Sequence, residues 1–171
     1  MGVNIHEHAA AVGRLVFRVY RPDGTVRDER RASNLMCVAG TTALASAINW
    51  SMAQDQNAAM GSPLSPANLY PIYGAVGSST TAATVYDTQL GAELGRSVVS
   101  EATTSAGTVL LFFFFGTTAS TWTVTEAGVF VSGTATATAT ANTGLLLDHT
   151  VFTAVTKTAS ETATAAFTFD F

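Results

Sequence analysis

The sequence predicts a mainly β fold, an antiparallel β-sandwich or barrel of seven to nine strands with one α-helix. Residues 13–20 and 162–171 alternate apolar and polar side chains with the period of two that is typical of half-buried strands. Val109–Phe115 (VLLFFFF) lies between two glycines and is too short for most helices. The 171 residues suffice for one domain with a single core.

The first third of the chain predicts a β-hairpin followed by the helix. Residues 13–20 end at Arg21-Pro22-Asp23-Gly24, a turn sequence that should return the chain as a second strand over residues 25–31. Between Thr41 and about Ala53, large apolar residues recur every four positions, which predicts the helix. We therefore divide the chain into an N-terminal arm, residues 1–12, and a single β-rich domain, residues 13–171.

The rest of the chain predicts further strands separated by turns. Strands are expected at residues 70–76, 96–100, 109–115, 122–132, 144–152 and 162–171. The phenylalanine-rich strand 109–115 should be central and covered on both faces, since it is apolar throughout. Residues 133–142 (GTATATATAN) fit either an extended edge strand or arm, or a solvated surface excursion.

Charge is scarce in this protein and unevenly distributed. Charged residues make up 12% of the chain, about half the usual share, and interface cores are depleted in charge in the same way. The net charge of −4 argues against nucleic acid as a partner. Six of the eight basic residues precede residue 32, which favours a solvated hairpin face over a docking patch for an acidic partner.

Metal, cofactor and membrane sites are not predicted. The pair His6 and His8 has no third ligand at a characteristic spacing. Cys37 is the only cysteine and is expected to be a small core residue. No lysine-containing phosphate loop is present, and the longest apolar run is far shorter than the ~20 residues of a membrane-spanning helix. The N-terminus has no apolar secretory segment.

Catalytic residues are not predicted either, and we expect no enzymatic activity. Asp148 and His149 are neighbours, so in a strand their side chains should point to opposite faces and form no mutual hydrogen bond. The other carboxylates show no spacing that pairs an acid with a base, and we expect them to be surface or turn residues. DTQLGAELGR, with the acidic turn residue Asp87, follows the small-residue loop of residues 77–84, and a salt bridge between Glu93 and Arg96 should fix that loop to the sheet.

Several segments together resemble small structural proteins of tailed bacteriophages. They are the DG-turn hairpin, ASNLMCVAG before the helix, GSSTTAATVYDTQLGAELGR, TEAGVF, and the KTASETAT strand at the end of the chain. The pattern is similar to the attachment modules of tail-collar and tail-fibre proteins and to capsid-decoration proteins. It covers most of residues 13–171.

The resemblance implies a non-enzymatic virion component that is assembled in the host cytoplasm and whose partners are copies of itself and other phage structural proteins. The candidates for loop fixation or subunit contact are Asp87, Glu93, Arg96, Trp122 and Glu126. An alternative is a carbohydrate- or receptor-binding β-sandwich, for which Trp122, Tyr70 and Tyr73 would supply exposed aromatic rings.

Overall fold

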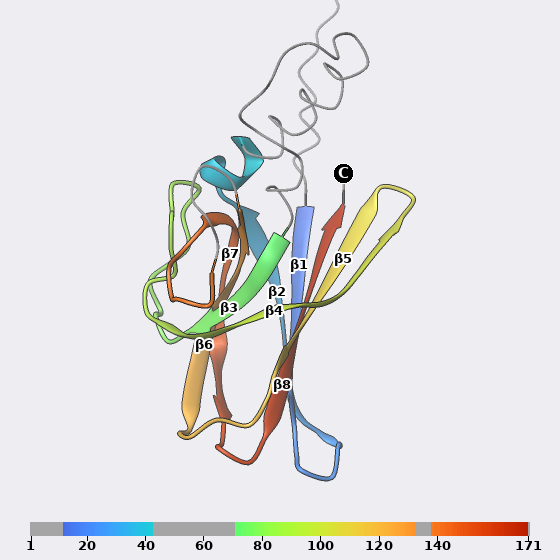
Figure 1. Ribbon diagram of the computed structural model, residues 1–171, viewed down its shortest axis with the longest axis vertical. Coiled ribbons are helices and arrows are strands. Elements are labelled where there is room, and N and C mark those ends of the chain that lie inside the picture. The colour runs from blue at the N-terminus through green and yellow to red at the C-terminus, as the bar shows by residue number, and fades with distance from the viewer. Residues whose placement is uncertain (1–11, 43–70, 133–137, 171) are drawn as a thin grey trace, which may run out of the picture.

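Eight antiparallel strands close into a barrel in the computed structural model, which describes residues 12–42, 71–132 and 138–170 (Figure 1). Going round the barrel, the order is β1-β2-β7-β6-β3-β4-β5-β8. The strands are β1 Val12–Tyr20, β2 Val26–Met36, β3 Pro71–Gly77, β4 Glu93–Ser105, β5 Thr108–Phe115, β6 Trp122–Val131, β7 Leu145–Lys157 and β8 Thr162–Asp170. The mainly β prediction is therefore confirmed, as a closed barrel.

The C-terminal strand closes the barrel on one side. β8 pairs antiparallel with β1 from Val12↔Asp170 to Tyr20↔Thr162, and on its other edge it pairs with β5. Its alternating sequence places Ala163, Phe167 and Phe169 in the interior, as the sequence predicts. The first hairpin is also confirmed, since Arg21 and Thr25 flank a turn in which Gly24 has a φ of 82°.

The seam between β2 and β7 is held largely by arginine side chains. Only Leu35↔His149 and Met36↔Asp148 are paired there. Farther along, Arg30 donates hydrogen bonds to the backbone carbonyls of Thr153 (3.2 Å) and Ala154 (3.1 Å), and Arg27 donates to that of Thr156. The clustered basic residues of the first hairpin thus include two that join β2 to β7.

The interior is filled by aromatic and branched side chains from all around the barrel. Phe113 and Phe167 meet edge to face with ring centroids 5.8 Å apart, and both are fully buried. The prediction that strand 109–115 is covered on both faces is wrong, because Phe114 is 49% exposed. A barrel is a single layer of strands, so side chains that point outward are covered only where a loop or helix crosses them.

The helix begins earlier than predicted. Residues 38–42 are helical, and Thr41 N donates to the carbonyl of Cys37 (3.0 Å). Gly40 lies inside this helical turn, and a larger residue would not fit there, because its β-carbon would come within 2.2 Å of Leu147 Cα. The predicted remainder of the helix, residues 43–53, lies outside the described residues, as do residues 1–11 of the predicted arm.

The threonine- and alanine-rich segment is partly described. Residues 138–142 form exposed turns, which agrees with the surface excursion and not with an extended strand. Residues 133–137 lie outside the described part of the chain.

Candidate functional site

Glu126 on β6 fixes the loop of residues 78–92 to the outer face of the barrel. Its side chain is fully buried and accepts backbone hydrogen bonds from Ser79 (3.0 Å), Gly91 (2.9 Å) and Ala92 (2.8 Å). Gly77 makes room for this carboxylate, because a β-carbon there would lie 2.3 Å from Glu126 Oε1. These bonds favour the ionised form, and the pKa of Glu126 is lowered although burial acts in the opposite direction.

His149 on β7 joins Glu126 to Asp87 in the middle of the same loop. Its Nε2 lies 3.0 Å from Glu126 Oε2, and its Nδ1 lies 2.7 Å from Asp87 Oδ2. Asp87 in turn accepts hydrogen bonds from the backbone N–H of Thr84 (2.8 Å) and from its hydroxyl (2.6 Å). Burial alone would lower the pKa of His149, but the hydrogen bonds to Glu126 and Asp87 outweigh it and raise that pKa.

The geometry of this buried carboxylate–imidazole network suits it to hold the loop in place. Both ring nitrogens of His149 face carboxylate oxygens, and its side chain is only 5% exposed. An imidazole in this arrangement has no nitrogen left to accept a proton from a substrate. The network therefore orders the loop, and its three members come from three separate parts of the chain.

The sequence-based interpretation of the carboxylates was partly wrong. Glu126 is buried in β6 and the side chain of Glu93 in β4 is 1% exposed, so these two are not surface or turn carboxylates. Glu161 is buried too, but it does lie in a turn, where its N–H donates to the carbonyl of Thr158 (3.2 Å). Each is compensated by hydrogen bonds or an ion pair. His149 and Asp148 have their side chains on opposite faces of β7, with that of Asp148 directed into the barrel.

Glu93 and Arg96 form a second buried attachment, an ion pair that holds another surface segment to the barrel. Their ion pair has N···O distances of 2.6 and 2.7 Å and is almost fully buried. The guanidinium group of Arg96 lies 4.5 Å from the ring centroid of Phe130 and also donates to the carbonyls of Thr138 (2.9 Å) and Thr143 (3.1 Å). This pair holds the turns of residues 138–143 against the barrel.

The aromatic side chains proposed for ligand binding make contacts within the chain. Trp122 is half-buried, with the ammonium group of Lys157 at 5.2 Å from its ring, and it lies against Gly95. Tyr73 is half-buried beneath Arg96, at 5.5 Å. Tyr70 lies outside the described residues. In the described part of the chain, the large aromatic side chains that are exposed are Tyr86 and Phe114, neither of which was proposed for ligand binding.

Asp148 is a buried carboxyl group in a different setting. It is fully buried, and burial raises its pKa well above the usual range, an effect that the side chain of Asn34 opposes. Within the described residues, neither of its oxygens has a hydrogen-bond partner of normal geometry, and the same holds for the amide of Asn34 and the hydroxyl of Thr150. Such a group is expected to be protonated, and hence neutral, in the folded protein.

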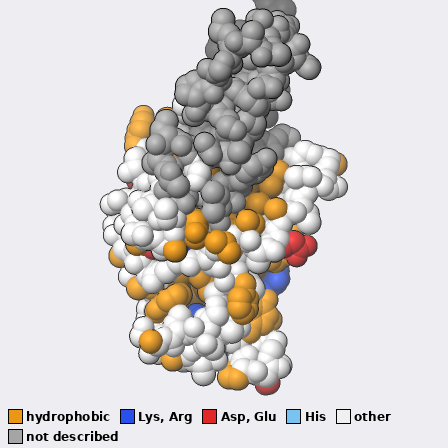
Figure 2. Space-filling view, in the orientation of Figure 1, with side chains coloured by type: hydrophobic (Ala, Val, Ile, Leu, Met, Phe, Trp, Pro, Cys, Tyr) orange, Lys and Arg blue, Asp and Glu red, His pale blue; other side chains and the backbone are white. Residues whose placement is uncertain are grey.

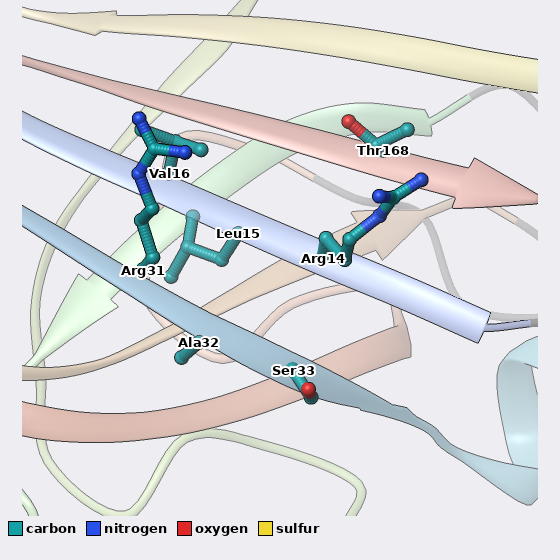
Figure 3. Close-up of a pocket in the computed structure, with 7 residues that line it drawn as sticks. All are labelled: Arg14, Leu15, Val16, Arg31, Ala32, Ser33 and Thr168. Atoms are coloured by element: carbon teal, nitrogen blue, oxygen red, sulfur yellow. The ribbon is translucent and has the colours of Figure 1, made fainter.

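A shallow depression of about 500 Å³ lies on the outer face of β1, β2 and β8. Figure 3 shows that Arg14 and Arg31 project over it from neighbouring strands, with the small side chains of Ser33 and Thr168 nearby. Arg14 pairs with Asp170 (2.5 Å) and Arg31 pairs with Glu29 (2.7 Å), so both guanidinium groups are partly neutralised. The remaining lining residues are Leu15, Val16 and Ala32.

The described ranges hold neither a metal-binding cluster nor a helix that could span a membrane. No three His, Cys, Asp or Glu side chains there are placed to hold a metal ion, and His6 and His8 lie outside those ranges. No helix in the same part of the chain is long and apolar enough to cross a membrane. Cys37 is buried, as predicted, and burial raises the pKa of its thiol to about 12.

Comparison with known proteins gives no relative for this chain: no protein family, curated protein or solved structure matches it.

Proposed function

We propose that this protein is a non-enzymatic structural component on the exterior of a tailed-phage virion and that it works by packing against copies of itself. The phage assignment depends on the sequence resemblance. The self-association depends on the surface of the barrel.

The observation that carries the proposal is the distribution of exposed large hydrophobic side chains. Among the described residues, five of the six lie in two patches. The loop patch consists of Val38, Val85 and Tyr86, which are brought together by a hydrogen bond from Val38 N to the carbonyl of Val85 (2.8 Å). The strand patch has Val98 and Phe114 at its centre, on the outer faces of β4 and β5.

The strand patch is continuous across two strands. Val99 pairs with Phe113, so the next residues, Val98 and Phe114, lie opposite each other and point outward. Phe112, two positions before Phe114, shares this face and is half-buried; we include it in the strand patch. Exposed apolar patches on a soluble protein mark interaction surfaces.

The surroundings of the patches also suit protein contact. Uncharged side chains dominate the face of the molecule in Figure 2, and few charged side chains appear on it. Buried ion pairs such as Glu93–Arg96 remove further charge from the exterior. A surface of this kind resembles an interface core more closely than ordinary solvent-facing surface.

The carbohydrate-binding alternative has less support. Trp122 and Tyr73 are half-buried and contact cationic side chains, so neither offers an open ring face on which a sugar could stack.

Light scattering after size-exclusion chromatography tests the self-association. We expect an oligomer that dissociates in the Tyr86→Ser variant and persists in Thr88→Ala, a control on the same loop whose side chain is exposed. Mass spectrometry of purified phage particles from a lysate tests the location. A monomer at every concentration, or absence of the protein from particles, would refute the proposal, whereas glycan-array binding by the monomer would favour the alternative.

A further inference from the structure

The loop patch and the strand patch lie on opposite sides of the barrel. The loop patch lies over β7, because Cys37, which precedes Val38, donates a backbone hydrogen bond to Leu147 (2.9 Å). The strand patch lies on β4 and β5, and β5 is the fourth strand from β7 in either direction round the barrel. Figure 1 shows the loop on the left of the barrel, with the paired strands β4 and β5 running across the front toward the right.

This placement decides which kind of contact can cover both patches. A two-fold contact buries the same patch on both copies and leaves the other patch in water. A head-to-tail contact buries both patches, since each copy offers one patch to each of its two neighbours. We propose, as a refinement that rests on the self-association proposed above, that the loop patch of one copy packs against the strand patch of the next.

The shapes of the two surfaces are complementary. Tyr86 is 81% exposed and so stands out from its loop. The depression on β1, β2 and β8 adjoins the strand patch, because Phe112, Ala166 and Val16 are paired in one row across β5, β8 and β1. Its volume of about 500 Å³ lies within the ~300–1,000 Å³ range of ligand pockets, so an aromatic side chain fits there.

The charges on the two sides are also complementary. Around the depression, three guanidinium groups face two carboxylates, which leaves an excess of positive charge; the groups are Arg14, Arg18 and Arg31, with Asp170 and Glu29. Behind the loop patch, two carboxylates share one imidazole, which leaves an excess of negative charge. The exposed guanidinium groups beside the depression suit the face of an incoming tyrosine ring.

The loop patch is ordered before any contact forms. Tyr86 lies between Thr84 and Asp87, whose side chains are hydrogen-bonded to each other, and Asp87 is bound to His149. A side chain on a loop held in this way loses little conformational entropy on docking, which favours association. The buried network thus has a role in assembly, as the support of the loop patch.

Disulfide trapping between two cysteine variants tests this pairing. Thr88→Cys, on the same loop as Tyr86, is mixed in reduced form with Ser100→Cys, beside Val98 on β4, or with Ser33→Cys, in the depression, and each mixture is then oxidised; all three sites are exposed and leave the side chains of both patches in place. Cys37 can remain in place, because it is buried and its thiol pKa is raised to about 12, so it is unreactive in the folded protein. Wild-type protein is the control for this native thiol.

The expected result is a cross-linked dimer, at least tenfold enriched, in the mixture compared with either variant alone. Oligomers in which Thr88→Cys cross-links chiefly with itself, or in which neither Ser100→Cys nor Ser33→Cys cross-links with it, would overturn the head-to-tail contact and leave self-association intact. A wild-type protein that light scattering shows to be monomeric would instead overturn the proposed function, so the two failures are distinguishable.

Discussion

Replacing Glu126 by glutamine tests the claim that one buried carboxylate holds the loop of residues 78–92. Glutamine has nearly the same size, but its single carbonyl oxygen can replace only one of the two carboxylate oxygens. Oε1 of Glu126 accepts from Ser79 and Ala92, and Oε2 accepts from Gly91 and faces His149. In the variant, the amide NH₂ group therefore meets the N–H of Gly91, and two donors face each other.

The expected loss follows from these contacts. The N–H of Gly91, which is directed at a buried side chain, would lose its acceptor at a cost of about 1 kcal/mol, and the bonds that remain are no longer assisted by a charge, which weakens each by roughly 1 kcal/mol. We expect Glu126→Gln to lower the free energy of unfolding by about 3 kcal/mol. Glu101→Gln, a control at an exposed site on β4, should change it by less than about 0.5 kcal/mol.

Urea unfolding followed by tryptophan fluorescence measures both variants, and limited chymotrypsin digestion shows whether the loop opens. Cleavage after Tyr86 should be faster in Glu126→Gln than in Glu101→Gln, because the loop has lost part of its attachment. A loss below about 1 kcal/mol together with unchanged cleavage would show that the loop does not depend on this carboxylate.

Three further predictions concern the same buried groups. Gly77→Ala should cost about 1–3 kcal/mol in urea unfolding, because its β-carbon would collide with the Glu126 carboxylate, whereas Gly116→Ala, whose nearest neighbour would be 3.8 Å away, should be nearly neutral. The raised pKa of His149 stabilises the fold fully below pH ~6.5 and progressively less as the pH rises through the folded-state value, so His149→Gln should flatten the unfolding free energy above neutral pH. The raised pKa of Asp148 destabilises the fold as the pH rises above ~3.9, so Asp148→Asn should be the more stable protein at pH 8, and lower stability there would contradict a neutral Asp148.

The strands could be predicted from the sequence because their pattern is local. In β1 and β8, alternate residues point to the same side, so the apolar positions identify the interior face without knowledge of the partners. The start of the helix was misplaced for a reason that is not local. Gly40 reads as a boundary in the sequence, but its close contact with Leu147 gives it a packing role inside the first turn.

The buried network could not be predicted, because it depends on strand order and register. His149 is separated from Glu126 by 23 residues and from Asp87 by 62. The sequence does place Glu126 on the same face of its strand as Gly128 and Phe130, but only the packing of the loop shows that this face is covered. A glutamate among small and apolar residues of a strand indicates that a loop packs over its side chain. Gly77 on the neighbouring strand is a second indication, because it leaves space for that side chain.

The error over the phenylalanine-rich strand bears directly on function. A run that is apolar on both faces predicts two covered faces, and in β5 the barrel interior covers Leu111, Phe113 and Phe115, with Val109 partly buried against the same core. The outward residues Phe112 and Phe114 keep the composition of a buried face and are partly or largely exposed. Within the described residues nothing covers this outward face, and the self-association proposed above would cover it, in keeping with the low charge of the whole chain.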